Sequence, residues 1–181
     1  MPTDRLFFAL MPDAPAASQA EGWAQRMGAE RGLKLRRGAR EKFHITLFHV
    51  GDFVGWPQAV VDEACRVAAQ VHAAPFEVCL NRLGSFAGSA HRRPYVLLCT
   101  EAAALNAFQA HLHARLIAAG LTQGRQHVPY TPHLTLLYGR EPLAERSVAP
   151  LSWTVREFVL IRSFIGQGRH EHLGRWPLMG D

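Results

Sequence analysis

Two short stretches of the sequence share one pattern: residues 43–51 read F-H-I-T-L-F-H-V-G, and residues 132–139 read P-H-L-T-L-L-Y-G. In each stretch a histidine is followed by an apolar residue, a threonine and a leucine, within a run of otherwise core-like residues. The two histidines, His44 and His133, are separated by about half of the 181-residue chain. The repeat predicts an internal duplication in which each half contributes one histidine-bearing strand.

Both stretches have the composition of a buried β-strand, and side chains on a strand alternate between its two faces. We therefore expect His44, Thr46 and Phe48 to share one face and Leu47 and His49 to point the other way. The second stretch repeats this arrangement. The apolar face of each strand can pack beneath helices, which leaves the face with histidine and threonine for a cleft.

Two imidazoles and two hydroxyls on neighbouring strands suit the chemistry of a phosphodiester. An in-line displacement at phosphorus needs a base for the attacking oxygen and an acid for the departing one, and two histidines supply both near neutral pH. The hydroxyls of Thr46 and Thr135 can donate hydrogen bonds to the non-bridging oxygens. We therefore expect His44 and His133 to be catalytic and the two threonines to bind phosphate, with no metal or other cofactor.

A zinc site is the competing interpretation, because His127 or His49 can complete a ligand set with His44 and His133. Against it, strand alternation predicts that His49 points to the opposite face. Neither motif contains a carboxylate or a thiolate. The three cysteines of the chain are widely spaced and form no C-x-x-C pair, so they predict neither a disulfide framework nor a thiolate zinc site.

The remaining sequence predicts a single α+β domain over residues 1–181. Apolar or alternating runs predict further strands over 5–11, 75–83, 94–99, 153–164 and 170–178, and periodic apolar residues predict helices over 16–27, from 57 onward and over 102–119. Gly28 and Gly32 are expected to end the first helix, and Gly51 the first motif strand. Each motif strand follows a helix and a basic connector, as a duplication requires.

The composition restricts the kinds of partner and the cellular location that are expected for the protein. The sequence is 48% hydrophobic and carries 20 basic against 15 acidic residues, with a net charge of +5 at pH 7. Most basic residues are arginine, whose planar cation suits phosphate, so the charge permits an anionic partner without requiring one. No apolar run is long enough to span a membrane, and no signal segment is visible. We expect a cytoplasmic, monomeric protein with no membrane partner.

The two motifs, in this order and at this spacing, resemble those of the 2H phosphoesterases, specifically the bacterial and archaeal RNA 2′,3′-cyclic phosphodiesterases, also called 2′-5′ RNA ligases. The resemblance covers almost the whole chain. H-I-T-L (44–47) and H-L-T-L (133–136) match the two signatures, R-L-F-F-A-L-M-P (5–12) the first strand, and W-T-V-R-E-F-V-L-I-R-S-F (153–164) with R-W-P-L (175–178) the closing strands. It implies a bilobed fold with pseudo-two-fold duplication, in which two related antiparallel-rich sheets flanked by helices surround a central cleft.

The same resemblance implies metal-independent hydrolysis of an RNA-terminal ribose 2′,3′-cyclic phosphate to a 2′-phosphate, with 2′-5′ ligation as the reverse reaction. By this similarity His133 activates water and His44 protonates the leaving 3′ oxygen. The residue that stacks on a base is not evident, and Phe48 is the candidate on the cleft face. Further candidates for substrate binding are Arg92, Arg93, Arg125 and Tyr130.

Two alternatives stay open. The first keeps the chemistry but replaces RNA by a small cyclic nucleotide or an ADP-ribose cyclic phosphate. The second is a non-catalytic RNA or nucleotide binder that retains the cleft, although a binder has little need for both histidines. The partners implied are therefore RNA 3′ ends or nucleotides that carry a 2′,3′-cyclic phosphate.

Overall fold

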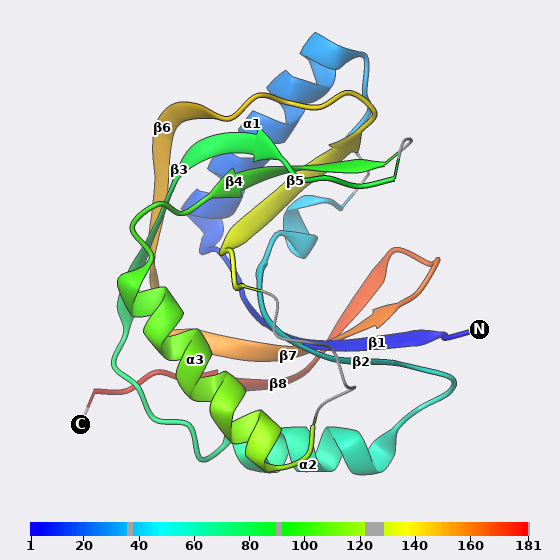
Figure 1. Cartoon of the computed structure of the whole chain (residues 1–181), viewed down its shortest axis with the longest axis vertical. Helices are drawn as coiled ribbons and strands as arrows, with labels where there is room; N and C mark the ends of the chain where they lie inside the picture. The colour runs from blue at the N-terminus through cyan, green and yellow to red at the C-terminus, as the bar shows by residue number, and fades with distance from the viewer. Residues whose placement is uncertain (36–37, 90–91, 122–128, 181) are drawn as a thin grey trace.

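The structure is a computed structural model and describes residues 1–35, 38–89, 92–121 and 129–180. Its helices and strands follow one another in the order shown in Figure 1. They are β1 (Asp4–Leu10), α1 (Ala14–Arg31), the 3-10 turn η1 (Arg40–Lys42), β2 (Ile45–Phe53), α2 (Gln58–Ala68), β3 (Phe76–Ser85), β4 (Arg93–Leu98), α3 (Ala103–Ala118), β5 (His133–Gly139), β6 (Arg146–Val155), β7 (Glu157–Phe164) and β8 (Arg169–Pro177). None of these helices is long and apolar enough to cross a membrane, as far as the described residues go.

The strands form one antiparallel sheet in the order β6-β3-β4-β5-β2-β1-β7-β8. The motif strands β2 and β5 are its central neighbours, and they are joined through a single residue pair, Ile45 with Leu134. Two four-stranded halves diverge from this junction, as the upper and lower groups of strands in Figure 1 show. The expected α+β class is confirmed, and the two related sheets are the two halves of one sheet.

The duplication is visible in how the chain enters each motif strand. The units β1-α1-β2 and β4-α3-β5 each consist of two antiparallel neighbouring strands joined by a helix. Helix α1 packs against β5 and β6 of the other half, and α3 packs against β2 as well as β3. Because the helices bridge the halves in this way, residues of both halves share one main hydrophobic core.

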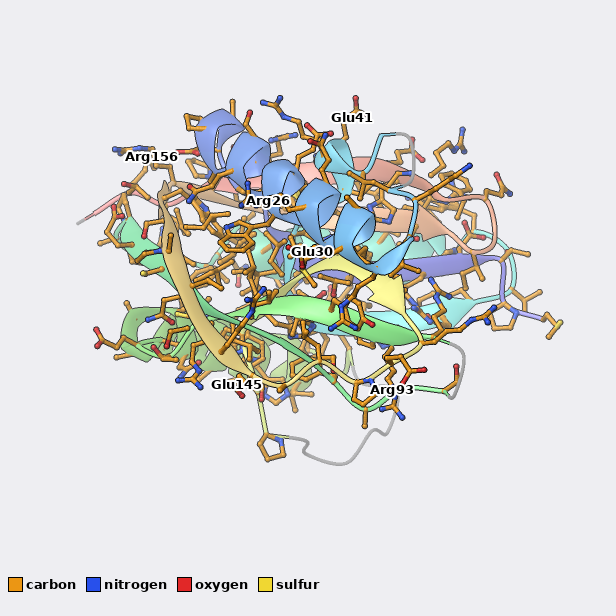
Figure 2. The ribbon with its side chains drawn as sticks, turned by 90° about the horizontal axis from the view of Figure 1, so that it is seen from above. Arg26, Glu30, Glu41, Arg93, Glu145 and Arg156 are labelled. Carbon is orange, nitrogen blue, oxygen red and sulfur yellow. The ribbon has the colours of Figure 1, made fainter. Side chains whose placement is uncertain are left out.

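Helix α1 shows how local sequence sets the element bounds. The Asp13 side chain accepts a hydrogen bond from the Ala16 amide at 2.9 Å, which caps the first turn, and Gly32 ends the helix with a φ of 64°. Gly28 does not end it, contrary to expectation. A Cβ on Gly28 would lie 2.6 Å from the Leu33 carbonyl oxygen, so glycine is needed there for close packing. The exposed side of α1 carries charged residues, Arg26 and Glu30 among them (Figure 2).

Two strand predictions also need correction. Strand β2 continues through Gly51 to Phe53, because Gly51 stays in the ladder opposite Leu6. The single segment expected over 153–164 is two strands, separated at Arg156 (Figure 2). β6 pairs with β3 at one edge of the sheet, whereas β7 lies between β1 and β8. Both pieces are apolar and alternating, so their sequence carries no sign that the chain passes from one half to the other.

Candidate active site

A β-bulge follows the histidine and threonine of the first motif. Along the β1–β2 ladder Ala9 lies opposite Thr46 and Phe8 lies opposite Phe48, so Leu47 is an extra residue in β2. Side chains of directly opposed residues share a face. Thr46 therefore shares the face of Ala9, whereas Phe48 is turned to the opposite face with Phe8.

The second motif contains the same bulge. Along the β4–β5 ladder Val96 lies opposite Thr135 and Tyr95 lies opposite Leu137, so Leu136 is the extra residue. Leu136 occupies the same place in H-L-T-L that the bulged leucine occupies in H-I-T-L. The internal duplication thus extends to the irregularity of the strand.

The bulges change which side chains accompany the histidines, and the prediction for Phe48 is wrong. Phe48 is 9% exposed and belongs to the main core, because the bulge moves it away from the face of Thr46. His49 was expected on the face opposite to Thr46 but lies opposite Phe7, on the same face as Thr46. Its Nε2 lies 2.9 Å from a carboxylate oxygen of Asp52, so it is engaged in a hydrogen bond at the far end of β2.

His44 and His133 are held by equivalent hydrogen bonds. Nδ1 of His44 lies 2.6 Å from the carbonyl oxygen of Lys42, and Nδ1 of His133 lies 2.8 Å from that of Thr131. In both cases the acceptor belongs to the residue two positions earlier in the chain. A carbonyl can only accept, so the proton of each neutral imidazole resides on Nδ1 and leaves Nε2 available for chemistry.

Each catalytic candidate also packs against a phenylalanine ring. The rings of His44 and Phe7 have centroids 4.9 Å apart, and those of His133 and Phe86 are 4.7 Å apart in an edge-to-face arrangement. Phe7 lies on β1 beside β2, and Phe86 follows the end of β3. These contacts restrict the rotation of both imidazoles, and sequence reasoning named neither phenylalanine.

The surroundings disfavour the charged form of both histidines. Burial is the main cause that lowers the pKa of His133, with a smaller opposing effect from the Thr131 carbonyl. Burial also lowers the pKa of His44, where the Lys42 carbonyl partly opposes it and positive charge on His133 lowers it further. The residues that follow the two histidines, Ile45 and Leu134, are paired across β2 and β5, so the two motifs begin side by side.

Thr46 and Thr135 are half-buried, and neither hydroxyl has a hydrogen-bond partner in the part of the chain that the structure describes. Tyr130, another candidate for substrate binding, contacts the first motif strand. Its hydroxyl donates a hydrogen bond of 3.1 Å to the Thr46 carbonyl, and burial raises the pKa of Tyr130. Tyr130 thereby fastens the segment before β5 to the first motif strand.

The arginine candidates separate into three cases. The Arg92 guanidinium lies 4.2 Å from the centroid of the exposed Tyr138 ring, and Tyr138 lies opposite Pro94 on the face of Thr135. Arg93 lies opposite Gly139 at the start of β4, so alternation turns it away from that face. Arg125 lies outside the described residues, as does His127.

The structure adds two histidines that sequence reasoning did not include. His170 and His172 lie on β8, and positive charge on His172 lowers the pKa of His44. The alternating H-E-H of residues 170–172 was the available signal, because it places both imidazoles on one face of a strand. Within the described ranges, no three histidine, cysteine or acidic side chains lie close enough together to hold a metal ion.

These contacts define the site by its side chains, which are carried by adjacent strands: two half-buried imidazoles, and two threonine hydroxyls that have no hydrogen-bond partner among the described residues. Such a set can exchange protons and donate hydrogen bonds to an anion. A cavity of about 480 Å³ lies elsewhere, between the end of α1 and the β5–β6 connection, and is lined in part by Met27, Arg31 and Leu143. It shares no residue with the site, so the chemistry favours the histidine pair.

Comparison with known proteins agrees with this architecture. The chain is 28% identical over 178 residues to the RNA 2′,3′-cyclic phosphodiesterase of Geobacillus stearothermophilus, an alignment that covers 92% of the chain and 56% of that protein. The chain thus spans little more than half the length of this curated relative.

Solved structures show the same fold at low sequence identity. The apo structure of E. coli LigT superposes with a TM-score of 0.74 at 21% identity, over 99% of this chain and all of LigT. TT0787 of Thermus thermophilus gives a TM-score of 0.77 at 22% identity, over 98% of this chain and 99% of that one. The model of the 2′-5′ RNA ligase superfamily matches residues 12–163, which include both motifs. The chain belongs to the 2′-5′ RNA ligase superfamily.

Proposed function

We propose that the protein is a metal-independent phosphoesterase that hydrolyses the ribose 2′,3′-cyclic phosphate at an RNA 3′ end to a 2′-phosphate. The observation that carries the proposal is the matched pair of Nδ1 to carbonyl hydrogen bonds, which presents Nε2 of His44 and Nε2 of His133 in the same way. A single histidine fixed in this manner has many structural explanations. Two of them at equivalent positions of a duplicated unit fit a reaction that needs one acid and one base.

In the proposed reaction a water molecule attacks phosphorus and the bond from phosphorus to the 3′ oxygen breaks. Nε2 of His133 takes a proton from the water, and Nε2 of the protonated His44 gives a proton to the departing 3′ oxygen. The hydroxyls of Thr46 and Thr135 donate hydrogen bonds to the non-bridging oxygens, where negative charge increases. The products are a 3′ hydroxyl and a 2′-phosphate. When the 5′ hydroxyl of a second RNA replaces water as the nucleophile, the same groups join it to phosphorus as the bond to the 3′ oxygen breaks, which gives a 2′-5′ linkage.

Several observations support RNA or a nucleotide as the substrate. The relative from Geobacillus stearothermophilus is named for the cyclic phosphodiesterase activity, and E. coli LigT has been solved with 3′-AMP and with ATP. On this chain Arg92 lies over the Tyr138 ring on the face of Thr135, where a cation and an aromatic surface can contact a nucleotide. The net charge of +5 agrees with an anionic partner.

The test compares an oligonucleotide ending in a 2′,3′-cyclic phosphate with a cyclic mononucleotide and with ADP-ribose cyclic phosphate, each with and without a chelator. We expect the oligonucleotide to be converted to the 2′-phosphate at an unchanged rate when the chelator is present. The Thr46→Val and Thr135→Val variants should lose about 1–3 kcal/mol of transition-state stabilisation, since each loses one hydrogen-bond donor. A strong preference for the mononucleotide would rule out RNA as the substrate. Binding of these substrates without turnover would rule out the proposed enzymatic activity.

A further inference from the structure

A third imidazole packs directly on His44. The ring of His170 has its centroid 5.8 Å from that of His44 and 5.8 Å from that of Phe7, with edge-to-face geometry in both contacts. His170 belongs to β8, which is separated from β2 by β1 and β7 in the sheet. In a flat sheet these side chains would lie far apart, so the β7–β8 hairpin must curve toward His44 (Figure 1).

The two nitrogens of His170 have different environments. Nδ1 is buried and has no hydrogen-bond partner among the described residues. Nε2 has no hydrogen bond to any described residue and is not among the buried unpaired atoms, so it remains accessible. Burying an unpaired polar atom destabilises a fold, and an apolar ring of similar shape would avoid that cost. A histidine at this position is therefore explained better by what Nε2 can do than by packing.

His170 is also expected to be neutral. Burial, followed by positive charge on His44, Lys42 and His172, lowers the pKa of His170 to about 4. A neutral imidazole carries one proton, and no acceptor from the described residues lies beside Nδ1. The proton therefore resides on Nε2, which makes His170 an accessible hydrogen-bond donor beside the proposed acid.

Lys42 adds a positive charge to the same place. Its Nζ would lie 3.8 Å from a Cβ built on Gly168, in the β7–β8 turn. No carboxylate pairs with Lys42 in the described part of the chain. The backbone carbonyl of Lys42 holds His44, and the positive charge of its ammonium group contributes to the lowered pKa of His170.

We propose that His170 is a third substrate-binding histidine, whose Nε2–H donates a hydrogen bond to a non-bridging oxygen of a phosphate ester held at His44, with the Lys42 ammonium as its charge partner. The identity of that phosphate as the reacting group rests on the proposed function. The anion site itself rests on the contacts of His170 and extends the site to a strand outside the two motifs.

The test uses inorganic phosphate as the probe in isothermal titration calorimetry at pH 7, together with kcat/KM for a cyclic-phosphate substrate. The His170→Phe variant keeps a ring and loses the donor, whereas His170→Gln places an amide donor near the position of Nε2. We expect His170→Phe to weaken phosphate binding and lower kcat/KM by about ten- to a hundredfold, as the loss of one hydrogen bond to a charged group predicts. His170→Gln should stay much closer to the unaltered protein.

Stability gives the second measurement. His170→Phe removes the unpaired buried Nδ1, so its melting temperature should be equal to or above that of the unaltered protein while its phosphate affinity falls. Lys42→Gln retains the backbone carbonyl that holds His44 and should weaken phosphate binding most at low ionic strength. His72→Gln, an exposed histidine in the α2–β3 connection, is the matched control and should change neither measurement.

The outcomes separate this proposal from the proposed function. If the unaltered protein hydrolyses cyclic phosphate and His170→Phe binds phosphate and turns over equally well, the third histidine is refuted and the function stands. The proposal is also refuted if His170→Gln loses as much phosphate binding as His170→Phe and the melting temperature of His170→Phe is lowered. That outcome would show that His170 serves packing. If phosphate binding depends on His170 but no cyclic phosphate is cleaved, the anion site stands and the proposed reaction does not.

Discussion

The pH dependence of turnover offers a sharp test of the histidine pair. The profile of kcat/KM reports the free enzyme and that of kcat reports the enzyme–substrate complex. Burial lowers the pKa of both His44 and His133 below the ordinary value of 6.5 in the free protein. The base must be neutral and the acid protonated, so we expect kcat/KM to follow a bell centred below pH 6.5.

The substrate should move this bell. A cyclic phosphate is a monoanion, and a charge about 4 Å from the His44 imidazolium contributes about 1 kcal/mol in water and about 4 kcal/mol at an effective dielectric constant of about 20. At about 1.4 kcal/mol per pKa unit, this range corresponds to about 1–3 units. The groups that lower the pKa of His44 in the free protein, besides burial, are positive charges on His133 and His172, and bound phosphate opposes them. The alkaline limb of kcat should therefore lie about 1–3 pH units above that of kcat/KM.

The assay follows conversion of adenosine 2′,3′-cyclic phosphate by chromatography from acid to alkaline pH at constant ionic strength. Chelator is present throughout, so that a metal-bound hydroxide does not contribute. Residual turnover by His44→Ala should lack the alkaline limb, because that variant has no acid to deprotonate. Coincident profiles of kcat and kcat/KM, or a kcat/KM that continues to rise above neutral pH, would refute the assignment of an acid and a base to this buried pair.

Three further predictions concern single residues. His44→Ala and His133→Ala should each lower turnover by about a hundredfold or more with little change in melting temperature, since positioned proton transfer is typically worth about 10²–10⁴; near-normal rates in a folded variant would contradict the pair. Tyr130→Phe removes the hydrogen bond to the first motif strand and should cost about 1 kcal/mol, seen as a fall of about 2–4 °C in melting temperature. An unchanged melting temperature of Tyr130→Phe would show that the hydrogen bond to Thr46 does not stabilise the fold. The free energy of unfolding should fall as the pH is lowered from 6.5 toward about 4, because His170 binds its proton more readily in the unfolded chain than in the fold. Denaturant titrations at several pH values check the slope, which should be shallower in His170→Phe.

The motif residues could be identified from the sequence because each motif is a continuous stretch of four residues and because the stretch occurs twice. Sequence reasoning correctly anticipated the α+β class and the end of the first helix at Gly32, a C-cap that depends on neighbouring residues alone. It misplaced Phe48, because strand alternation holds only while the ladder is regular. A bulge leaves no composition signal in H-I-T-L-F, where leucine and phenylalanine are both ordinary strand residues.

Long-range contacts were also beyond what the sequence shows. His170 meets His44 only because the β7–β8 hairpin curves across two intervening strands. Tyr130 lies three residues before the second motif in the sequence, yet its hydroxyl donates a hydrogen bond to the first motif strand. Both cases depend on how segments far apart in the chain are placed against one another, which no pattern within a single strand encodes.

The repeated bulge gives the leucine of each motif a physical role. The histidine is fixed through its Nδ1 by a carbonyl two residues earlier, and the apolar residue after it forms the one pair, Ile45 with Leu134, that joins the two halves. The threonine then faces the site. If alternation continued, the residue two positions after the threonine would also face the site and occupy it with a bulky apolar side chain. Because the leucine is an extra residue, both it and its successor turn to the core, and neither apolar side chain lies on the face of the histidine and threonine. The four-residue motif is thus a structural unit, in which two residues carry the proposed chemistry, one apolar residue joins the two halves and the other turns into the core.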